Sequence, residues 1–323
     1  VYILNGFVYV EDGATLNIEA GTIIRGDKDS KGSLIITRGS KINANGTVDQ
    51  PIVFTSNQPE GSRNYGDWGG IIILGNAPIN VAGGTSIIEG GVDTPEGDGV
   101  YGGANATDNS GILKYVRVEY PGIAFVPGNE INGITFGGVG SGTIVDHVMV
   151  SRSGDDAFEF FGGTVNCNYL IAHNTLDDDL DCDFGFSGKI QYAVVKRDPN
   201  FADASGSNGW ETDNDATGTT NTPQTNPTFS NITVVGPIQN AGDIININYK
   251  RGMHIRRNSS TDIFNSVVMG YPSGVMIDGS LCEASALANT LKVQNIVIAG
   301  HNNDFEVAAG STFDAAAWFN TVG

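Results

Sequence analysis

Acidic residues gather in one short stretch of the chain, between Asp155 and Asp183. The stretch holds eight carboxylates: Asp155, Asp156, Glu159, Asp177, Asp178, Asp179, Asp181 and Asp183. So many like charges repel one another unless a cation or hydrogen-bond donors lie between them. Carboxylate oxygens are the ligands that Ca²⁺ prefers, and a pair of carboxyl groups can also act as acid and base on a glycosidic bond. The stretch therefore predicts a cation site or acid–base chemistry, with a solvated acidic surface as the third alternative.

The spacing of these acids follows a repeat. The interval from Val148 to Leu170 is 22 residues and equals the interval from Asp155 to Asp177, and the apolar pattern returns 23 residues after Leu170, at Ala193. A period of this length in strand-like sequence, with Gly and Asn between the strands, is typical of a coil that stacks on the preceding coil. The sequence therefore predicts an all-β fold, a parallel β-helix with coils of about 18–30 residues.

Stacking of the coils is expected to bring acids of successive coils close together. Equivalent positions on successive coils of a parallel β-helix lie about 4.8 Å apart. If Val148 lies over Leu170 inside the coil, Asp155 must lie over Asp177, and Asp156 over Asp178. We expect all eight acids to hold Ca²⁺, and the candidates for catalysis are Asp155, Asp156, Asp177 and Asp178.

The rest of the chain is expected to form one domain over residues 1–323, with long surface loops. Polar, Gly-rich composition places the loops at about residues 56–67, 83–110 and 198–228. The run from Ile71 to Leu74 is apolar on both faces, so the 83–110 loop or a neighbouring chain should cover it. In the first coils, the similar patterns around Leu16 and Leu34 suggest a shorter coil in which these two leucines stack. The chain starts at Val1 and ends at Gly323 without features of a natural terminus, so both ends are expected to be truncated or processed.

Composition excludes several classes of function. The net charge of −19 makes binding to nucleic acid unfavourable, whereas divalent cations would be attracted. No apolar run is long enough to cross a bilayer, which argues against a transmembrane segment. The three cysteines, Cys167, Cys182 and Cys282, have neither zinc-site nor disulfide-scaffold spacing. Cys182 follows Phe160 by the same interval that separates Val148 from Leu170, which predicts a small buried side chain.

Ligand contacts outside the acidic stretch are predicted at one basic cluster and two indole rings. The cluster comprises Lys250, Arg251, Arg256 and Arg257, which could bind an acidic sugar or pair with the nearby Asp243 and Asp262. Trp68 and Trp210 lie beside polar stretches, where an indole ring can stack on a sugar or cover the end of a coil.

One short motif resembles the polygalacturonase-type glycoside hydrolases. Gly154-Asp155-Asp156 is similar to their Gly-Asp-Asp element. The chain lacks the Gly-His-Gly and Arg-x-Lys elements of that group, so the resemblance is confined to these three residues.

A broader resemblance covers most of residues 1–195. The phrases Glu19-Ala20-Gly21-Thr22, residues 68–77, 129–143 and 155–166 resemble those of large secreted or cell-surface proteins of Bacteroidota. This resemblance implies a right-handed parallel β-helix exported to the outer membrane surface or beyond, and it implies no assigned activity.

Together these features favour an extracellular or cell-surface structural or adhesive module over an enzyme. Stacked carboxylates would bind Ca²⁺ as a stabilising cofactor, and the partners would be polysaccharide, other copies of the chain or other surface proteins. The alternative is a carbohydrate-active enzyme, a hydrolase or lyase, or a glycan-binding protein that uses the same acidic face.

Overall fold

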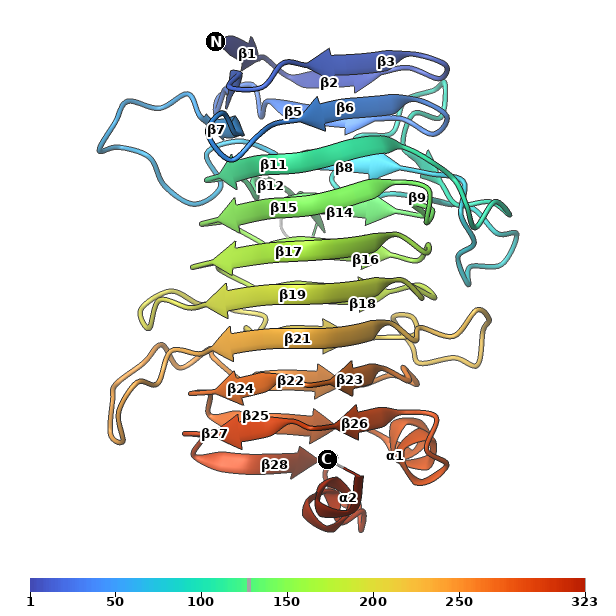
Figure 1. Cartoon of the computed structure of the whole chain (residues 1–323), viewed down its shortest axis with the longest axis vertical. Coiled ribbons are helices and arrows are strands. Elements are labelled where there is room, and N and C mark those ends of the chain that lie inside the picture. The colour runs from blue at the N-terminus through green and yellow to red at the C-terminus, as the bar shows by residue number, and fades with distance from the viewer. Residues whose placement is uncertain (127–128, 323) are drawn as a thin grey trace.

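The chain forms a right-handed parallel β-helix (Figure 1), as the repeat predicts. The computed structural model describes residues 1–126 and 129–322, so Pro127, Gly128 and Gly323 of the expected 1–323 domain lie outside the described residues. Within the described ranges, no helix is both long enough and apolar enough to span a membrane.

Two long parallel sheets make up the body. Sheet B has ten strands: β2 (Phe7–Val10), β5 (Ser33–Ile36), β8 (Ile71–Leu74), β14 (Ile134–Gly137), β16 (Phe158–Phe161), β18 (Leu180–Asp183), β20 (Trp210–Thr212), β22 (Arg251–Ile255), β25 (Ser273–Ile277) and β28 (Asn303–Val307). Sheet A has fourteen: β1 (Tyr2–Leu4), β3 (Thr15–Ile18), β4 (Ile23–Gly26), β6 (Lys41–Asn45), β7 (Ile52–Ser56), β11 (Gly111–Glu119), β15 (Ile144–Ser151), β17 (Asn166–His173), β19 (Lys189–Lys196), β21 (Thr228–Val235), β23 (Asp262–Phe264), β24 (Val267–Met269), β26 (Lys292–Gln294) and β27 (Val297–Ala299).

Smaller elements lie outside the two sheets. Two short antiparallel pairs join β9 (Ser86–Ile87) to β10 (Val100–Tyr101) and β12 (Ala124–Val126) to β13 (Asn129–Glu130). The helix α1 (Ser280–Leu287) lies between β25 and β26, and the helix α2 (Ala315–Val322) follows β28. At the C-terminal end, α2 lies beyond β28 (Figure 1).

A kink divides each long strand of sheet A into two segments. Tyr115, His147, Tyr169 and Tyr192 occupy the kink with positive φ, and Asn231 takes the same position in β21. This conformation is uncommon for residues other than Gly, although Asn tolerates it well. The four rings stack on one another, with neighbouring centroids 4.4 to 5.0 Å apart. We call the outer surface formed by the strand segments of sheet A before the kink the A1 face.

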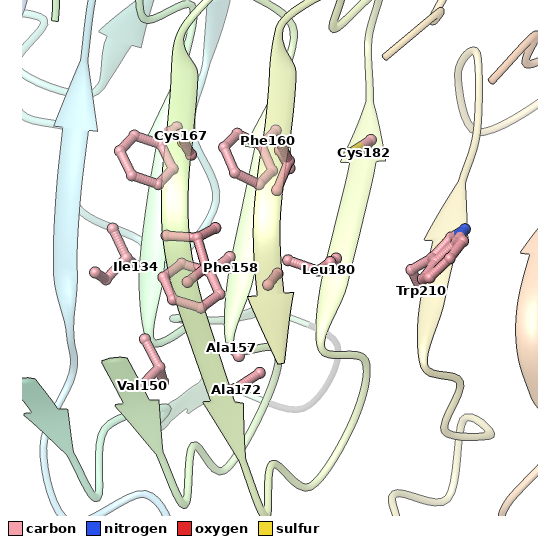
Figure 2. Close-up of a cluster of buried hydrophobic side chains, with 14 of the residues drawn as sticks. Ile134, Val150, Ala157, Phe158, Phe160, Cys167, Ala172, Leu180, Cys182 and Trp210 are labelled. Atoms are coloured by element: carbon pink, nitrogen blue, oxygen red, sulfur yellow. The ribbon is translucent and has the colours of Figure 1, made fainter. Parts of the chain in front are cut away.

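The observed register confirms the repeat that the sequence predicts. Val148 pairs with Leu170, and Leu170 pairs with Ala193. Phe160 lies beside Cys182, which is fully buried, as the spacing predicts (Figure 2). All three cysteines are buried free thiols. Apolar side chains from both sheets therefore fill the inside of the coil.

The predicted stacking of Leu16 on Leu34 in the first coils is wrong. Val8 pairs with Leu34, and Leu16 pairs with Ile42 instead. Both leucines occur in similar apolar patterns, but they belong to different sheets, so their sequences match without their strands being neighbours.

The segment between β8 and β11 contains the expected loop at about 83–110, together with β9 and β10. The segment after β8 covers sheet B, because Ile88, Val92 and Tyr101 pack on the outward side chains of Ile72 and Leu74. The stretch 198–228 differs from the prediction of one loop, since β20 within it is a buried strand of sheet B. Two loops therefore leave the body there, one before β20 and one after it.

Candidate carboxylate site on sheet B

The outer face of sheet B carries a row of titratable side chains. Register places Thr135, Glu159, Asp181, Glu211 and His254 side by side on successive strands. Side chains alternate across a strand, so the neighbours of these residues point inward and these five point outward. Four of the five can carry charge.

A second row lies where the chain enters these strands. Asn132, Asp156, Asp178 and Asn208 occupy equivalent positions on successive coils, and each side-chain oxygen accepts a backbone N–H of the next coil. Asp178 N–H donates to Asp156 Oδ1 at 2.8 Å, and Asp156 N–H donates to Asn132 Oδ1 at 3.3 Å. Arg251 N–H donates to Asn208 Oδ1 at 3.2 Å. The two aspartates therefore also hold the coils together.

The two rows, together with Asp155 and Asp177 one residue before the second row, bring carboxylate oxygens into close groups. Among the described residues, three groups each have one oxygen per residue within 4.8 Å of the others: Asp155, Asp156 and Asp177; Asp156, Glu159 and Asp181; Asp178, Asp181 and Glu211. Asp156, Glu159 and Asp178 are buried, whereas Asp155, Asp177 and Asp181 are half-exposed. Six of the eight predicted acids thus form one cluster, to which Glu211 must be added.

Burial and mutual repulsion raise the pKa of these carboxyl groups. Desolvation is the largest cause for Asp156 and Glu159, followed by the charges of Asp181 and Glu89 respectively. Desolvation also raises the pKa of Asp177, to about 6, while a hydrogen bond from Ser205 opposes the rise. The raised pKa values therefore favour protonated carboxyl groups in the cluster, whereas a bound cation would favour the ionised form.

Glu89 joins the cluster from the loop that covers sheet B. Asn132 Nδ2 donates to Glu89 Oε1 at 3.0 Å and also to Glu159 Oε2. Burial raises the pKa of Glu89 as well. No period in the sequence links Glu89 to this face, because a long loop carries it there.

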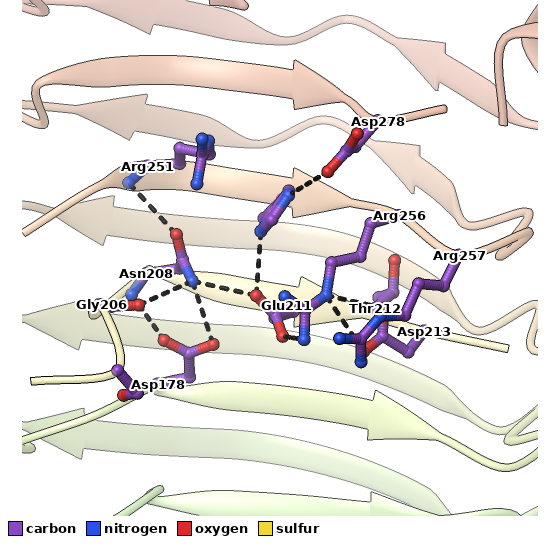
Figure 3. A network of polar contacts seen from close by, with 12 residues as sticks. Asp178, Gly206, Asn208, Glu211, Thr212, Asp213, Arg251, Arg256, Arg257 and Asp278 are labelled. Carbon is purple, nitrogen blue, oxygen red and sulfur yellow. Dashed lines mark hydrogen bonds and ion pairs between the residues drawn. The ribbon is translucent and has the colours of Figure 1, made fainter. Parts of the chain in front are cut away.

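Arginine and histidine side chains close the other end of the cluster (Figure 3). His254 bonds Glu211 through Nδ1 at 2.9 Å and Asp278 through Nε2 at 3.1 Å. Burial opposes protonation of His254, but the bonds to Asp278 and Glu211 outweigh it and raise its pKa. Arg256 pairs with both Glu211 and Asp213.

Three of the four residues of the predicted basic cluster are engaged in ion pairs, with partners other than the expected ones. Arg257 pairs with Asp213 at 2.9 Å, and Arg251 binds Glu306 through two bonds of 2.9 and 2.7 Å. The expected partners are occupied elsewhere: Asp262 pairs with Lys292, and Asp243 accepts backbone N–H groups. Lys250 donates only to a backbone carbonyl among the described residues, at 3.4 Å.

Four predicted site residues lie elsewhere. Trp68 and Trp210 are fully buried in the core, stacked on Phe54 and Phe229, so the prediction that they contact ligand is wrong. Asp179 faces inward and pairs with the fully buried Arg197 at 3.0 Å. Asp183 lies outside the three oxygen groups, and burial followed by the charge of Asp213 raises its pKa to about 8.

Two residues that complete the site, Glu211 and His254, could not be found from the repeat, because they do not follow the preceding strands at its regular interval. Glu211 pairs with Asp181 and His254 pairs with Glu211, but loops of different lengths separate their strands. Only a strand prediction for the segments around Trp210 and Met253 would have found them. The complete cluster offers oxygen ligands that could bind a metal ion, and adjacent carboxyl groups in different environments that could move protons.

Comparison with solved structures finds a catalytic domain of low similarity. Two structures of the catalytic domain of a GH87 α-1,3-glucanase, the variants D1068A and D1069A in complex with tetrasaccharides, are similar to the chain. Their identities are 12% and 11%, and their TM-scores are 0.39 and 0.37. Each alignment covers 96% of this chain and 64% of the glucanase chain. No curated protein matches the chain.

The family comparison spans almost the whole sequence. The profile of the pectate-lyase-like β-helix domain matches residues 1–321, which include every strand of both sheets and the whole carboxylate cluster. The chain belongs to the pectate-lyase-like β-helix domain family.

Proposed function

We propose that this domain cleaves a polysaccharide on the outer face of sheet B, with carboxyl groups as acid and base. The observation that carries the proposal is the group of Asp155, Asp156 and Asp177, whose oxygens lie within 4.8 Å of one another. Two of these residues, Asp155 and Asp177, are partly exposed, and Asp156 is buried. Membership of a pectate-lyase-like family also supports an enzyme over a purely structural or adhesive module.

Two half-exposed acids receive the chemical roles. Burial, followed by the charge of Asp177, raises the pKa of Asp155, so Asp155 keeps a proton that it can give to the glycosidic oxygen. Asp177 has a pKa of about 6 and is mainly ionised at neutral pH. The oxygens of Asp155 and Asp177 lie within 4.8 Å of each other. Carboxyl groups about 5 to 5.5 Å apart are typical of retaining enzymes, in which the carboxylate attacks the anomeric carbon, so this close spacing favours a retaining mechanism. In this proposal Asp177 attacks as the leaving-group oxygen takes the proton of Asp155, and Asp155 then deprotonates the water that releases the sugar.

The test is incubation with a polysaccharide panel, followed by measurement of the reducing ends released. Asp155→Asn and Asp177→Asn should each lower the rate by about 100-fold or more, because each removes an acid–base or nucleophilic group. Asp146→Asn, on the half-exposed surface of sheet A, serves as the matched control. Wild-type rates in both site variants would contradict the assignment. Unsaturated uronate products would show a lyase instead, and binding without cleavage would return the protein to an adhesive role.

A cation is the second candidate function of this face, and Ca²⁺ suits it best. Asp181 carries this proposal because it belongs to two of the three oxygen groups and one of its oxygens is buried without a hydrogen bond. Hard oxygen ligands in this number are what Ca²⁺ requires. Ca²⁺ at about 100 times its Kd should stabilise the fold by about 2.7 kcal/mol.

Calorimetric titration with Ca²⁺ and thermal melting in EGTA test the cation. Asp181→Asn should abolish binding, whereas Asp183→Asn, outside the oxygen groups, should leave it unchanged. No heat of binding together with no Tm difference between Ca²⁺ and EGTA would exclude the cation and leave protons to neutralise the cluster.

Export to the cell surface is a separate proposal that rests on the sequence resemblance, and fractionation of the source cells with an antibody would test it.

A further inference from the structure

The A1 face of sheet A carries a second groove on a different sheet from the carboxylate cluster. A cavity of about 470 Å³ lies there, lined mainly by residues of β17, β19, β21 and β23. Its lining includes Asn168, Gln191, Ser230 and Phe264, which register places side by side on successive strands. In Figure 1 the strands β17, β19 and β21 face the viewer, and no other segment passes in front of them.

Side-chain amides in this groove have unused hydrogen-bonding capacity. Among the described residues, Asn168 and Gln191 make no side-chain hydrogen bond, although both are half-exposed. Asn265 and Asn295, which also line the groove, differ, because Asn295 Nδ2 donates to Asn265 Oδ1 at 3.1 Å. A free amide both donates and accepts, so it matches a hydroxyl group better than it matches an ion.

An aromatic ring completes the groove. Phe264 is half-exposed on the outer face, and it has no aromatic partner in the described part of the chain. The kink tyrosines are different, because each ring face lies against the next ring. Phe264 therefore offers an apolar surface next to free amides, which is the combination that receives the C–H and O–H groups of a sugar.

The charge of the groove differs from that of sheet B. Lys189 is the one charged residue in its lining, and no carboxylate among the described residues lines it. The protein as a whole has a net charge of −19, so an acidic glycan would be repelled at long range, whereas a neutral one would not. The groove therefore matches an uncharged ligand that is rich in hydroxyl groups.

We propose that the A1 face binds a neutral polysaccharide chain at Asn168, Gln191, Ser230 and Phe264. This site needs no bond cleavage and does not depend on the acids of sheet B. A glycan held at this groove would keep the domain on a polysaccharide surface while the carboxylate cluster acts elsewhere on it.

Affinity electrophoresis and calorimetry test the site with defined probes: xyloglucan, galactomannan, laminarin and dextran as neutral chains, polygalacturonate and alginate as acidic ones. Phe264→Ala and Gln191→Ala should each weaken binding of a neutral chain by about tenfold, in line with the loss of one aromatic or hydrogen-bonding contact. Gln294→Ala is the matched control, since Gln294 is an exposed amide in the same row and lies outside the groove.

Asp155→Asn and Asp177→Asn separate this site from the proposed catalysis, because they should abolish cleavage and leave neutral-glycan binding unchanged. Failure to bind any neutral chain would overturn the proposal, and so would wild-type affinity in both Phe264→Ala and Gln191→Ala. Binding of acidic chains alone, lost on adding salt, would also overturn it, because Lys189 would then be the attracting group.

Discussion

At the scale of single residues, the same amino acid serves opposite purposes in neighbouring positions. Asp177, Asp178 and Asp179 follow one another in the sequence, yet Asp178 bonds the next coil, Asp177 meets solvent and Asp179 faces Arg197 inside. These three residues lie in the bent segment just before β18, where side chains do not follow the alternation of a strand, so a run of acids need not belong to one site. The run therefore contributes two residues to the cluster and one to the core.

The buried pair of Asp179 and Arg197 predicts an asymmetric response to mutation. Both side chains are 0% exposed. Asp179→Ala should destabilise the fold by about 3–5 kcal/mol, because Arg197 is left charged and buried without a carboxylate partner. Arg197→Met should cost less, since Asp179 can take a proton; its pKa is already about 7. Urea unfolding of the two variants measures the difference.

The partly exposed pair of Lys292 and Asp262 is the control for that experiment. Lys292→Met removes a 3.0 Å ion pair at the surface and should cost about 1 kcal/mol or less. Equal losses in Asp179→Ala and Lys292→Met would mean that burial of Arg197 does not set the cost.

The raised pKa values predict that stability falls as pH rises. Burial raises the pKa of Asp177 from 3.8 to about 6 and that of Asp183 from 3.8 to about 8. Between these values the folded protein holds protons that the unfolded chain releases, so unfolding is favoured as pH increases from about 4 to about 8. The Tm measured in EGTA should therefore decrease across this range.

Two comparisons sharpen the pH experiment. Asp183→Asn should flatten the upper part of the curve, because the residue no longer titrates. Ca²⁺ should also flatten it, because a cation stabilises the ionised carboxylates. A Tm that rises from about pH 5 to about pH 8 in EGTA would contradict the assigned protonation.

At the scale of elements, sequence period predicts stacking only where consecutive loops are short. The repeat placed Val148 on Leu170 and Asp155 near Asp177. It could not place Glu211 or Glu89, because an inserted loop changes the spacing before each of them. Trp68 shows a second limit of prediction from the sequence. It borders a polar stretch, but it is buried because it stacks on Phe54, which belongs to a strand before the loop.

The segment between β8 and β11 should behave as a cover for sheet B. Tyr101 is 2% exposed and packs with Phe161 at 6.2 Å between ring centroids. Tyr101→Ala should cost about 3–4 kcal/mol, as large-to-small core substitutions do, and should expose Ile72 and Leu74. Increased binding of a hydrophobic dye at native temperature would report that exposure. Tyr2→Ala, at an already exposed tyrosine, should change neither quantity.

At the scale of the whole molecule, each coil contacts mainly the coils next to it. Stability in such a solenoid is the sum of coil and neighbour terms, so damage at one end should remain local. The C-terminal end is covered by Trp318 of α2, whose indole N–H donates to Ala286 O at 3.1 Å. Trp318→Ala should therefore speed hydrogen exchange in β26 and β28 and leave β15 and β17 protected. Uniform loss of protection across the chain would mean that the β-helix unfolds as one unit.

The row of Asn132, Asp156, Asp178 and Asn208 has a consequence for the descent of such proteins. Its two ends carry an amide and its middle two positions carry a carboxylate, yet all four receive an N–H of the next coil through the same kind of oxygen. Replacement of Asp156 and Asp178 by Asn would keep the hydrogen bonds to the next coil and remove the two charges. A lineage could therefore remove two charges from the carboxylate cluster by two substitutions without losing its shape, and a relative with four amides in this row is expected to keep the fold with a weaker cation site.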